Sequence, residues 1–309
     1  MSESEKSEKG SKKKLILIIA ILVVSAAIAA VVILLMHKTE EYRLLKIFEV
    51  EGTANVSREG KGDIAPYVNM VLESGDKVSL DTGKLSIRAD EDKYIYLEEQ
   101  TEILLKASGN ATNSKTEIEI LKGSITNDIQ NKLTEDSTYE VNTPNSTMSV
   151  RGTVFFVIVY EIDGVRYTRI CVFDGEVASK LVYKDGTVSA NEVSVKKGKE
   201  VTIYEDGTTT DYVSEPTDID YNTLPESVLL KLKGINDEGK DLSITNPEIT
   251  RILEGPYEVT FTYNGKVFGT QTVKKGEKAE EPKLSPAPSG KWQYDFSKPV
   301  ERDITIEWK

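Results

Sequence analysis

The sequence of 309 residues contains one cysteine and one histidine. With Cys171 alone, no disulfide can form within the chain, so burial and backbone pairing must hold the fold together. With His37 alone, neither a Ser-His-Asp arrangement nor a histidine-based metal site can be built in the rest of the chain. A Gly-rich phosphate loop is also missing. We therefore expect no catalytic residues, no metal site and no cofactor, and we do not expect an enzyme.

Positive charge is also scarce, since 39 Lys and Arg face 51 Asp and Glu, for a net charge of −12. Binding to nucleic acid needs a basic face, so a nucleic-acid partner is not expected. The acidic clusters at 90–92 and 218–220 could bind calcium, but neither has the Asp/Asn-Gly ladder of a calcium loop. Solvated acidic turns are the better interpretation of both clusters.

Long hydrophobic runs are absent with one exception, residues 15–36, which carry no charge and only Ser25 as a polar residue. As a helix this stretch would reach about 33 Å, which is enough to cross a hydrocarbon core. A cleaved signal peptide is the alternative, because Ala27-Ile28-Ala29 has the spacing of a cleavage site. The apolar run continues to Met36, which favours an uncleaved transmembrane helix.

Lysines precede this run and predict its orientation. Lys6, Lys9, Lys12, Lys13 and Lys14 would keep residues 1–14 inside as a cytoplasmic tail. The expected localisation is thus the cell membrane, as a single-pass protein that contacts the membrane through residues 15–36. The C-terminal bulk would then be extracytoplasmic.

Helical periodicity is nearly absent from residue 46 to residue 205, and a mainly β fold is expected there. Short runs rich in Val, Ile, Thr and Tyr alternate with turn residues. They lie at Lys46–Val50, Lys77–Leu80, Tyr94–Leu97, Glu117–Leu121, Tyr139–Asn142, Val154–Tyr160, Arg166–Phe173 and Glu200–Tyr204. Glycines 152, 175 and 198 recur every 23 residues. Such a period predicts a chain that coils, as in an irregular β-solenoid.

Several motifs in this stretch resemble the FecR domain in order and spacing. They are Val50-Glu51-Gly52, Gly75-Asp76, Leu121-Lys122-Gly123, Asn142-Thr143-Pro144, Val150-Arg151-Gly152-Thr153-x-Phe155 and Asp174-Gly175-Glu176-Val177. The resemblance covers residues 46–205 and implies an extracytoplasmic, all-β sensory or interaction module, as in iron-uptake regulators that signal to a sigma factor. Those regulators have a folded cytoplasmic domain, whereas this sequence offers only residues 1–14, so direct control of a sigma factor is not expected.

Residues 206–255 are expected to form a linker with one short helix at 224–234. Thr223 could cap the start of this helix, and Gly234 could end it. Its apolar positions Val228, Leu229 and Leu232 form one stripe, which favours a packing role over a partner-facing one.

Residues 256–309 predict a second, smaller β domain. Asn264-Gly265 is a type I′ hairpin signal, and residues 303–308 read as a closing strand. The stretches "VTFTYNG", "TVKKGEKAEEP" and "DITIEW" are similar to the Listeria–Bacteroides (internalin B-type) repeat of bacterial surface proteins. This resemblance implies a β-grasp-like fold.

Arg151 is a permanent charge beside an apolar strand, followed by Gly152 and Thr153. It could clamp a strand crossing by donating to backbone carbonyls, or it could capture an anionic ligand; the clamp is the favoured interpretation. The candidate binding aromatics are Tyr94, Tyr96, Tyr263, Trp292 and Tyr294, with core packing as the alternative for Trp292.

The expected function is a non-catalytic binding or sensory module at the bacterial cell surface. Its partner would be a cell-envelope component or a membrane protein. The alternative is an adhesive or structural protein associated with the cell wall, without a signalling role.

Overall fold

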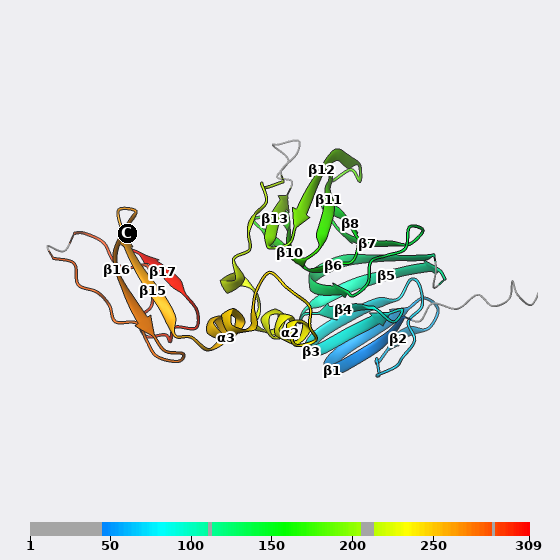
Figure 1. Ribbon diagram of the computed structural model, residues 1–309, viewed down its shortest axis with the longest axis horizontal. Helices are drawn as coiled ribbons and strands as arrows, with labels where there is room; N and C mark the ends of the chain where they lie inside the picture. Colours follow the sequence, from blue (N-terminus) through cyan, green and yellow to red (C-terminus); the bar gives the residue numbers. More distant parts are fainter. Residues whose placement is uncertain (1–44, 111–112, 205–212, 286–287) are drawn as a thin grey trace, which may run out of the picture. The chain divides into compact units, whose positions relative to one another are not determined.

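A computed structural model of the chain describes residues 45–110, 113–204, 213–285 and 288–309 (Figure 1). Strands dominate these residues, as the sequence predicted, and they form one sheet of 14 strands and one of three. The described part contains two α-helices, α2 (Glu226–Asp237) and α3 (Asn246–Glu254), and a 3-10 turn at Tyr221–Thr223.

The large sheet consists of strands β1 to β14. Their bounds are β1 Leu45–Arg58, β2 Gly62–Ile64, β3 Lys77–Ala89, β4 Lys93–Leu97, β5 Thr101–Gly109, β6 Ser114–Ile129, β7 Thr138–Thr143, β8 Ser146–Val150, β9 Val154–Ile162, β10 Val165–Asp174, β11 Glu176–Val182, β12 Val188–Lys196, β13 Lys199–Tyr204 and β14 Thr217–Asp218. Each run predicted as a strand lies within one of these strands.

The predicted β-solenoid is wrong, because the strands pair mainly as antiparallel neighbours. Only β6 and β7 pair in parallel within the described part of this sheet. A solenoid would stack successive coils in parallel, whereas here β9 and β10, or β11 and β12, fold back on each other as hairpins. The 23-residue period marks stacked turns instead: the amide of Lys197 donates to the carbonyl of Gly175, and Thr153 Oγ1 donates to the carbonyl of Glu176.

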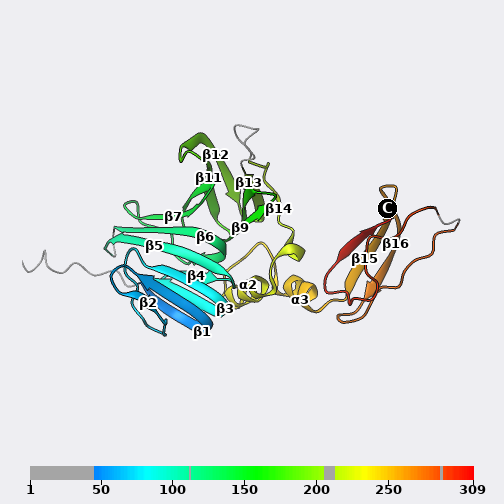
Figure 2. The same cartoon turned by 180° about the vertical axis from the view of Figure 1, so that it is seen from behind.

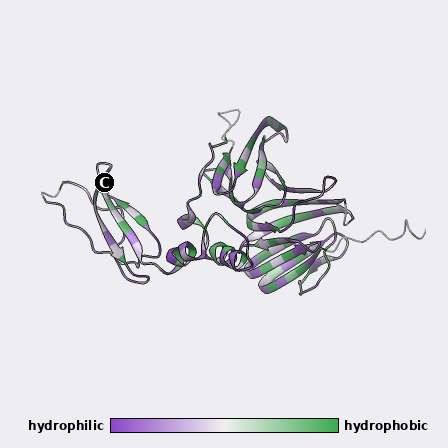
Figure 3. Cartoon of the chain, viewed as in Figure 1, coloured by the Kyte–Doolittle hydropathy of each residue, from purple (hydrophilic) through white to green (hydrophobic). Residues whose placement is uncertain are grey.

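The main core lies on one face of this sheet, where alternate residues of each strand point inward. Along β4 buried and half-buried positions alternate, and the same alternation of hydrophobic and hydrophilic residues is visible along many strands (Figure 3). Ile47, Ile87 and Ile95 are register neighbours on β1, β3 and β4, and all three are fully buried. Burial of such side chains stabilises the sheet by about 1.5–3 kcal/mol each.

A second core forms on the outer face of β9 and β10, where α2 and α3 pack. Val154, Phe156, Cys171 and Phe173 of the sheet pack in one cluster with the apolar face of the helices. Figure 2 shows α2 and α3 as consecutive helices beside the large sheet. That face consists of Val228, Leu229, Leu232 and Ile235 of α2 with Ile249 and Ile252 of α3. Within the stretch 206–255, predicted as a linker with one short helix, residues 226–237 and 246–254 form two helices that pack on the sheet.

The boundaries of these helices differ from the sequence prediction. Helix α2 follows Pro225 and runs through Gly234 to Asp237, so Gly234 does not end it. Helix α3 was not predicted, although it begins with a capping box between Thr245 and Glu248. The packing role predicted for Val228, Leu229 and Leu232 agrees with their burial.

The small sheet has the order β16-β15-β17, with β15 at Tyr257–Tyr263, β16 at Lys266–Val273 and β17 at Ile304–Glu307. Asn264 and Gly265 both have positive φ, as the predicted type I′ turn requires. A β-grasp fold would carry a helix across this sheet, but residues 257–285 and 288–309 contain none. Trp292, from the loop before β17, covers Phe261 instead.

The predicted single-pass membrane localisation has to be corrected. Within residues 45–110, 113–204, 213–285 and 288–309, no helix has the length and apolar character needed to cross a membrane. Residues 15–36, on which the transmembrane prediction rested, lie outside the described residues, as does the predicted tail 1–14.

Gly83 tests the close pairing of β1 with β3. It lies opposite Gly52, has a φ of 98°, and a Cβ there would lie 2.2 Å from the carbonyl oxygen of Glu51. We predict that Gly83→Ala lowers the free energy of unfolding by about 2–5 kcal/mol, because positive-φ strain and steric overlap add. Gly186→Ala is the control, since Gly186 has a φ of 84° and open space around it. Equal losses for both variants in urea unfolding would contradict the steric account.

Candidate functional site

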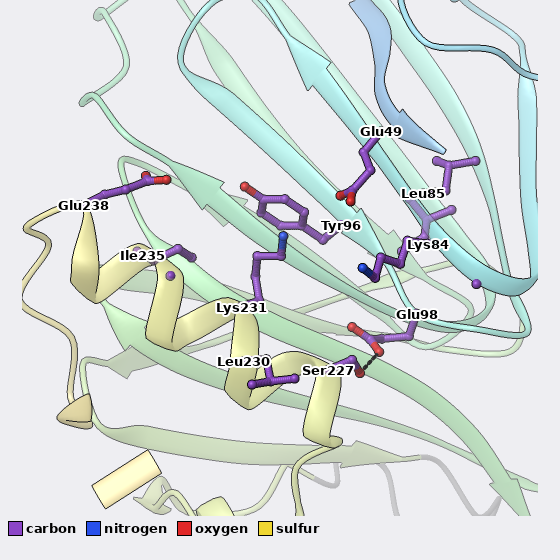
Figure 4. Close-up of a pocket in the computed structure, with 13 residues that line it drawn as sticks. Glu49, Lys84, Leu85, Tyr96, Glu98, Ser227, Leu230, Lys231, Ile235 and Glu238 are labelled. Atoms are coloured by element: carbon purple, nitrogen blue, oxygen red, sulfur yellow. Dashed lines mark hydrogen bonds between the residues drawn. The ribbon is translucent and has the colours of Figure 1, made fainter. Parts of the chain in front are cut away.

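A groove of about 330 Å³ lies between the sheet and helix α2 (Figure 4). Strands β1, β3 and β4 supply one wall, and one side of α2 supplies the other. The side chains that determine its chemistry are Glu49, Lys84, Tyr96 and Glu98 from the sheet with Ser227, Leu230, Lys231 and Glu238 from the helical side.

Helix α2 forms this wall because its two faces differ. Val228, Leu229 and Leu232 are buried against the sheet, which leaves Leu230 and Lys231 on the side that borders the groove. Leu230 is 51% exposed. A large apolar side chain that stays this exposed beside a hollow is a candidate contact for a ligand.

The aromatic ring of Tyr96 lines the sheet side of the groove, and two further rings lie next to it. The ring of Tyr96 stacks on that of Tyr94 with centroids 6.1 Å apart, and Phe48 meets Tyr94 edge-on at 5.4 Å. Tyr94 and Tyr96 were both candidates from the sequence; Tyr96 lines the groove, and Tyr94 stacks on it from outside the lining. Burial, followed by the nearby charge of Asp128, raises the pKa of Tyr96, so its phenol stays neutral.

Lys231 reaches across the groove from α2 to Tyr96. Its ammonium nitrogen lies 4.0 Å from the centroid of the Tyr96 ring, which is the geometry of a cation–π contact (Figure 4). On the neighbouring ring, the guanidinium carbon of Arg88 lies 5.9 Å from the centroid of Tyr94. Cations thus lie near both tyrosines.

Three carboxylates border the same space: Glu49, Glu98 and Glu238. Glu98 accepts a hydrogen bond from the hydroxyl of Ser227. Burial raises the pKa of Glu98, while the Ser227 hydroxyl and the charge of Lys231 oppose that rise. None of these three carboxylates forms an ion pair with a residue that the structure describes, whereas Lys84 approaches Glu51 at 3.7 Å.

A buried ion pair fastens the far end of α2 to the sheet. Lys240, just beyond the helix, donates to Asp128 of β6 at 2.6 Å and to the carbonyl of Ile129 at 3.2 Å. The side chain of Asp128 is only 2% exposed. A buried carboxylate needs a partner, so this contact fixes where the turn after α2 can lie.

Arg151 lies on the surface and makes no hydrogen bond or ion pair with a described residue; it borders a separate hollow with Leu133 and Glu135. The contacts at this crossing come from its neighbours. Thr153 is buried and donates to the carbonyl of Glu176, and the absence of a side chain on Gly175 allows the carbonyl of Gly152 to approach it closely. A clamp built by Arg151 itself therefore has no contact to support it, and Arg151 stays a candidate ligand contact.

The remaining predicted aromatics do not join the groove. Trp292 is 3% exposed and donates from Nε1 to the carbonyl of Pro282, so it belongs to the core of the small sheet. Tyr263 and Tyr294 are half-buried in the same module, where Tyr294 meets Phe296 edge-on at 5.2 Å.

Other chemistry is limited in the described residues. Cys171 is fully buried, and burial raises the pKa of its thiol, so it behaves as an inert core residue. No group of three or more His, Cys, Asp or Glu residues is arranged to hold a metal in the described part. The groove thus offers aromatic, carboxylate and aliphatic side chains for contact with a ligand.

Sequence reasoning missed Glu98, Ser227 and Lys231. A partial signal was present, since Tyr94 and Tyr96 alternate along β4 and therefore share one face, and Glu98 follows at the same spacing just after the strand ends. The helix that covers part of this face could not be read from the alternation, because Ser227 and Glu98 are 129 residues apart.

Comparisons with known proteins bear on the sheet side of this groove. Residues 76–178 match the protein family described as FecR protein. This stretch runs from just before β3 into β11 and confirms the FecR resemblance for that part of the chain. The similarity of residues 256–309 to the Listeria–Bacteroides repeat has no such match and stays a prediction.

Among solved structures, two crystal structures of a candidate anti-sigma factor from Parabacteroides distasonis ATCC 8503 are similar to this chain. Their sequence identities are 11% and 12%, and their TM-scores are 0.38 and 0.37. Each match covers 75% of this chain and 98% of the other. No curated protein matches the chain.

Lys240 tests how α2 is anchored. We predict that Lys240→Met lowers the free energy of unfolding by about 3 kcal/mol, because Asp128 would be left buried and unpaired. Lys197→Met is the control, since Lys197 forms an exposed ion pair with Asp241 at 2.8 Å and should cost less than about 1 kcal/mol. Equal losses for the two variants in urea unfolding would show that the Asp128 contact is not a buried anchor.

Glu98 gives the fold a pH dependence with a definite sign. The pKa of Glu98 in the folded chain is raised above its ordinary value of 4.5. The stability that protonated Glu98 contributes is therefore fully present below pH 4.5 and is lost as the pH rises through the folded pKa. We predict that Glu98→Gln unfolds at higher urea than the wild type at pH 7, and that this gain disappears toward pH 4. The exposed neighbour variant Glu99→Gln should show no such trend. A destabilised Glu98→Gln at pH 7 would refute the burial of an under-compensated carboxylate.

Proposed function

We propose that this chain is a non-catalytic signalling module of FecR type, and that it recognises a partner through the groove between β4 and α2. The observation that supports this proposal most is the groove itself, in which aromatic, carboxylate and aliphatic side chains converge. Its sheet wall between Gly83 and Glu98 lies inside the stretch that matches the FecR family. Its other wall, α2, lies outside that stretch.

The groove can couple binding to the position of α2. Near the start of the helix Ser227 bonds Glu98, and beyond its end Lys240 bonds Asp128. A partner that contacts Glu98 or Lys231 competes with interactions that hold the helix. Such a partner shifts the equilibrium between the docked and the displaced position of α2 only by the difference between its affinities for these two states. This difference in affinity is the thermodynamic requirement for a switch.

A change in α2 can be passed further along the chain. Helix α3 contacts α2 and ends at Glu254, directly before the small sheet begins at Tyr257. The hydroxyl of Tyr257 donates to the carbonyl of Leu253 at 2.9 Å, and Arg251 pairs with Asp303 at 2.8 Å. In this proposal α3 is the element that links an occupied groove to residues 257–309.

Leu230 allows the proposal to be tested in the cell. The gene is deleted from its host and restored as the wild type, as Leu230→Arg or as Val188→Arg, and transcripts are compared. Leu230 and Val188 are 51% and 52% exposed, so both substitutions should change stability by less than about 0.5 kcal/mol. We expect deletion to alter a defined set of transcripts, and we expect the wild type and Val188→Arg to restore it.

Leu230→Arg should fail to restore those transcripts while the protein accumulates to the wild-type level. The proposal is wrong if deletion leaves the transcripts unchanged, because a signalling module would then have no output. It is also wrong if Leu230→Arg restores them fully, because the groove would then not be the recognition site.

A further inference from the structure

We infer that the groove binds a lysine or arginine side chain presented by an extended peptide segment of a partner protein, and that Lys231 occupies this position in the unbound chain. This inference rests on the proposed role of the groove and names the chemistry of its ligand. Three independent features of the groove lead to it: its uncompensated charge, its aromatic ring and its apolar rim.

The uncompensated charge of the groove is negative. Glu49, Glu98 and Glu238 face it without an ion pair to any described residue. Of the two lysines in its lining, Lys84 is near Glu51 outside this set of carboxylates, and Lys231 lies over a ring. A positive group that enters would therefore meet Glu49 and Glu238 without a competing ion pair, and Glu98, which accepts one hydrogen bond from Ser227. An anionic group would be repelled.

The ring of Tyr96 already binds a cation within the chain, through a cation–π contact. The ammonium of Lys231 lies 4.0 Å from its centroid, and the carboxylates at the same groove add electrostatic attraction. Since Lys231 has no ion pair with a described residue, this contact is worth only about 0.5–2 kcal/mol, and its four-carbon side chain can swing away. A partner's cation can replace Lys231 over the Tyr96 ring at a small cost in free energy.

The rim favours a peptide over a free small amine. Leu230 and Phe48 are 51% and 46% exposed, and Phe48 contacts Tyr94, whose ring stacks on Tyr96 of the groove. A small amine would leave these side chains in water. An extended segment with apolar residues on both sides of its cation would cover them, which adds buried apolar area to the charge contact.

The test uses the full chain and three probes: acetyl-Gly-Leu-Lys-Leu-Gly-amide, the same peptide with norleucine in place of lysine, and n-butylammonium. Binding is measured by calorimetry and by the NMR shifts of the tyrosine rings. The key variant is Lys231→Met, which keeps an apolar side chain of similar length but removes the internal cation. Lys233→Met is the matched control, because Lys233 lies on the same helix and contacts Thr250 of α3 instead.

We expect Lys231→Met to bind the lysine peptide about tenfold more tightly than the wild type does, which corresponds to the loss of a competitor worth about 1.4 kcal/mol. Lys233→Met, with the same change in net charge, should bind like the wild type within about twofold. The peptide should bind more tightly than n-butylammonium, and the norleucine peptide should not bind. Glu98→Gln placed on the Lys231→Met background should weaken binding.

The inference is overturned if Lys231→Met gains no more affinity than Lys233→Met, or if the norleucine peptide binds as well as the lysine peptide. Equal affinity for n-butylammonium and the lysine peptide would overturn the peptide part and assign the site to small cations. Failure here together with loss of signalling in Leu230→Arg would leave the groove as a recognition site for an uncharged ligand. Peptide binding without any effect of Leu230→Arg on transcripts would contradict the signalling role alone.

Discussion

The ion pair between Asp128 and Lys240 is the constraint on which the candidate site depends. Asp128 lies on the outer face of β6 with a side chain that is only 2% exposed, so a cation must reach it. Lys240 does so from the turn after α2, at 2.6 Å. The apolar seam of Val228, Leu229 and Leu232 holds the helix against the sheet, but apolar packing alone is not directional. The ion pair between Lys240 and Asp128 is directional, so it fixes the position of α2 beside β4. The groove forms between these two elements.

The chemistry of the groove follows from the alternation of the strands. Inward residues of β4 fill the core, which leaves Tyr94 and Tyr96 on the outer face, and Glu98, directly after the strand, is half-buried beside the groove. Helix α2 covers this face only in part, so these side chains are neither buried in the core nor fully hydrated. Partial burial raises the pKa of Glu98 and keeps the phenol of Tyr96 neutral. The same partial cover lets Lys231 reach the Tyr96 ring.

The sequence predicted the strands and the Asn264-Gly265 turn because both are local signals. The solenoid prediction was wrong because alternating side chains and regularly spaced turns occur both in hairpins and in coiled β-structures. A regular spacing of turns does not determine which strands pair with each other. Helix α3 could have been found from the capping box of Thr245 and Glu248. The site residues Tyr94 and Tyr96 were chosen as aromatics, but their neighbour Lys231 comes from a helix that only the tertiary fold brings to them. Arg151 was chosen as a candidate because its charge lies beside an apolar strand in the sequence, but its side chain is exposed on the surface.

Amide hydrogen exchange on α2 in the full-length wild-type chain tests the central claim most directly, because the groove exists only if this helix is docked. The account predicts that the amides of Leu232 and Ile235 exchange as slowly as that of Cys171 in β10, since all three residues belong to one packed cluster. Exchange of Leu232 and Ile235 at the rate of an isolated short helix would contradict it, because residues 226–237 would then be a linker without a groove.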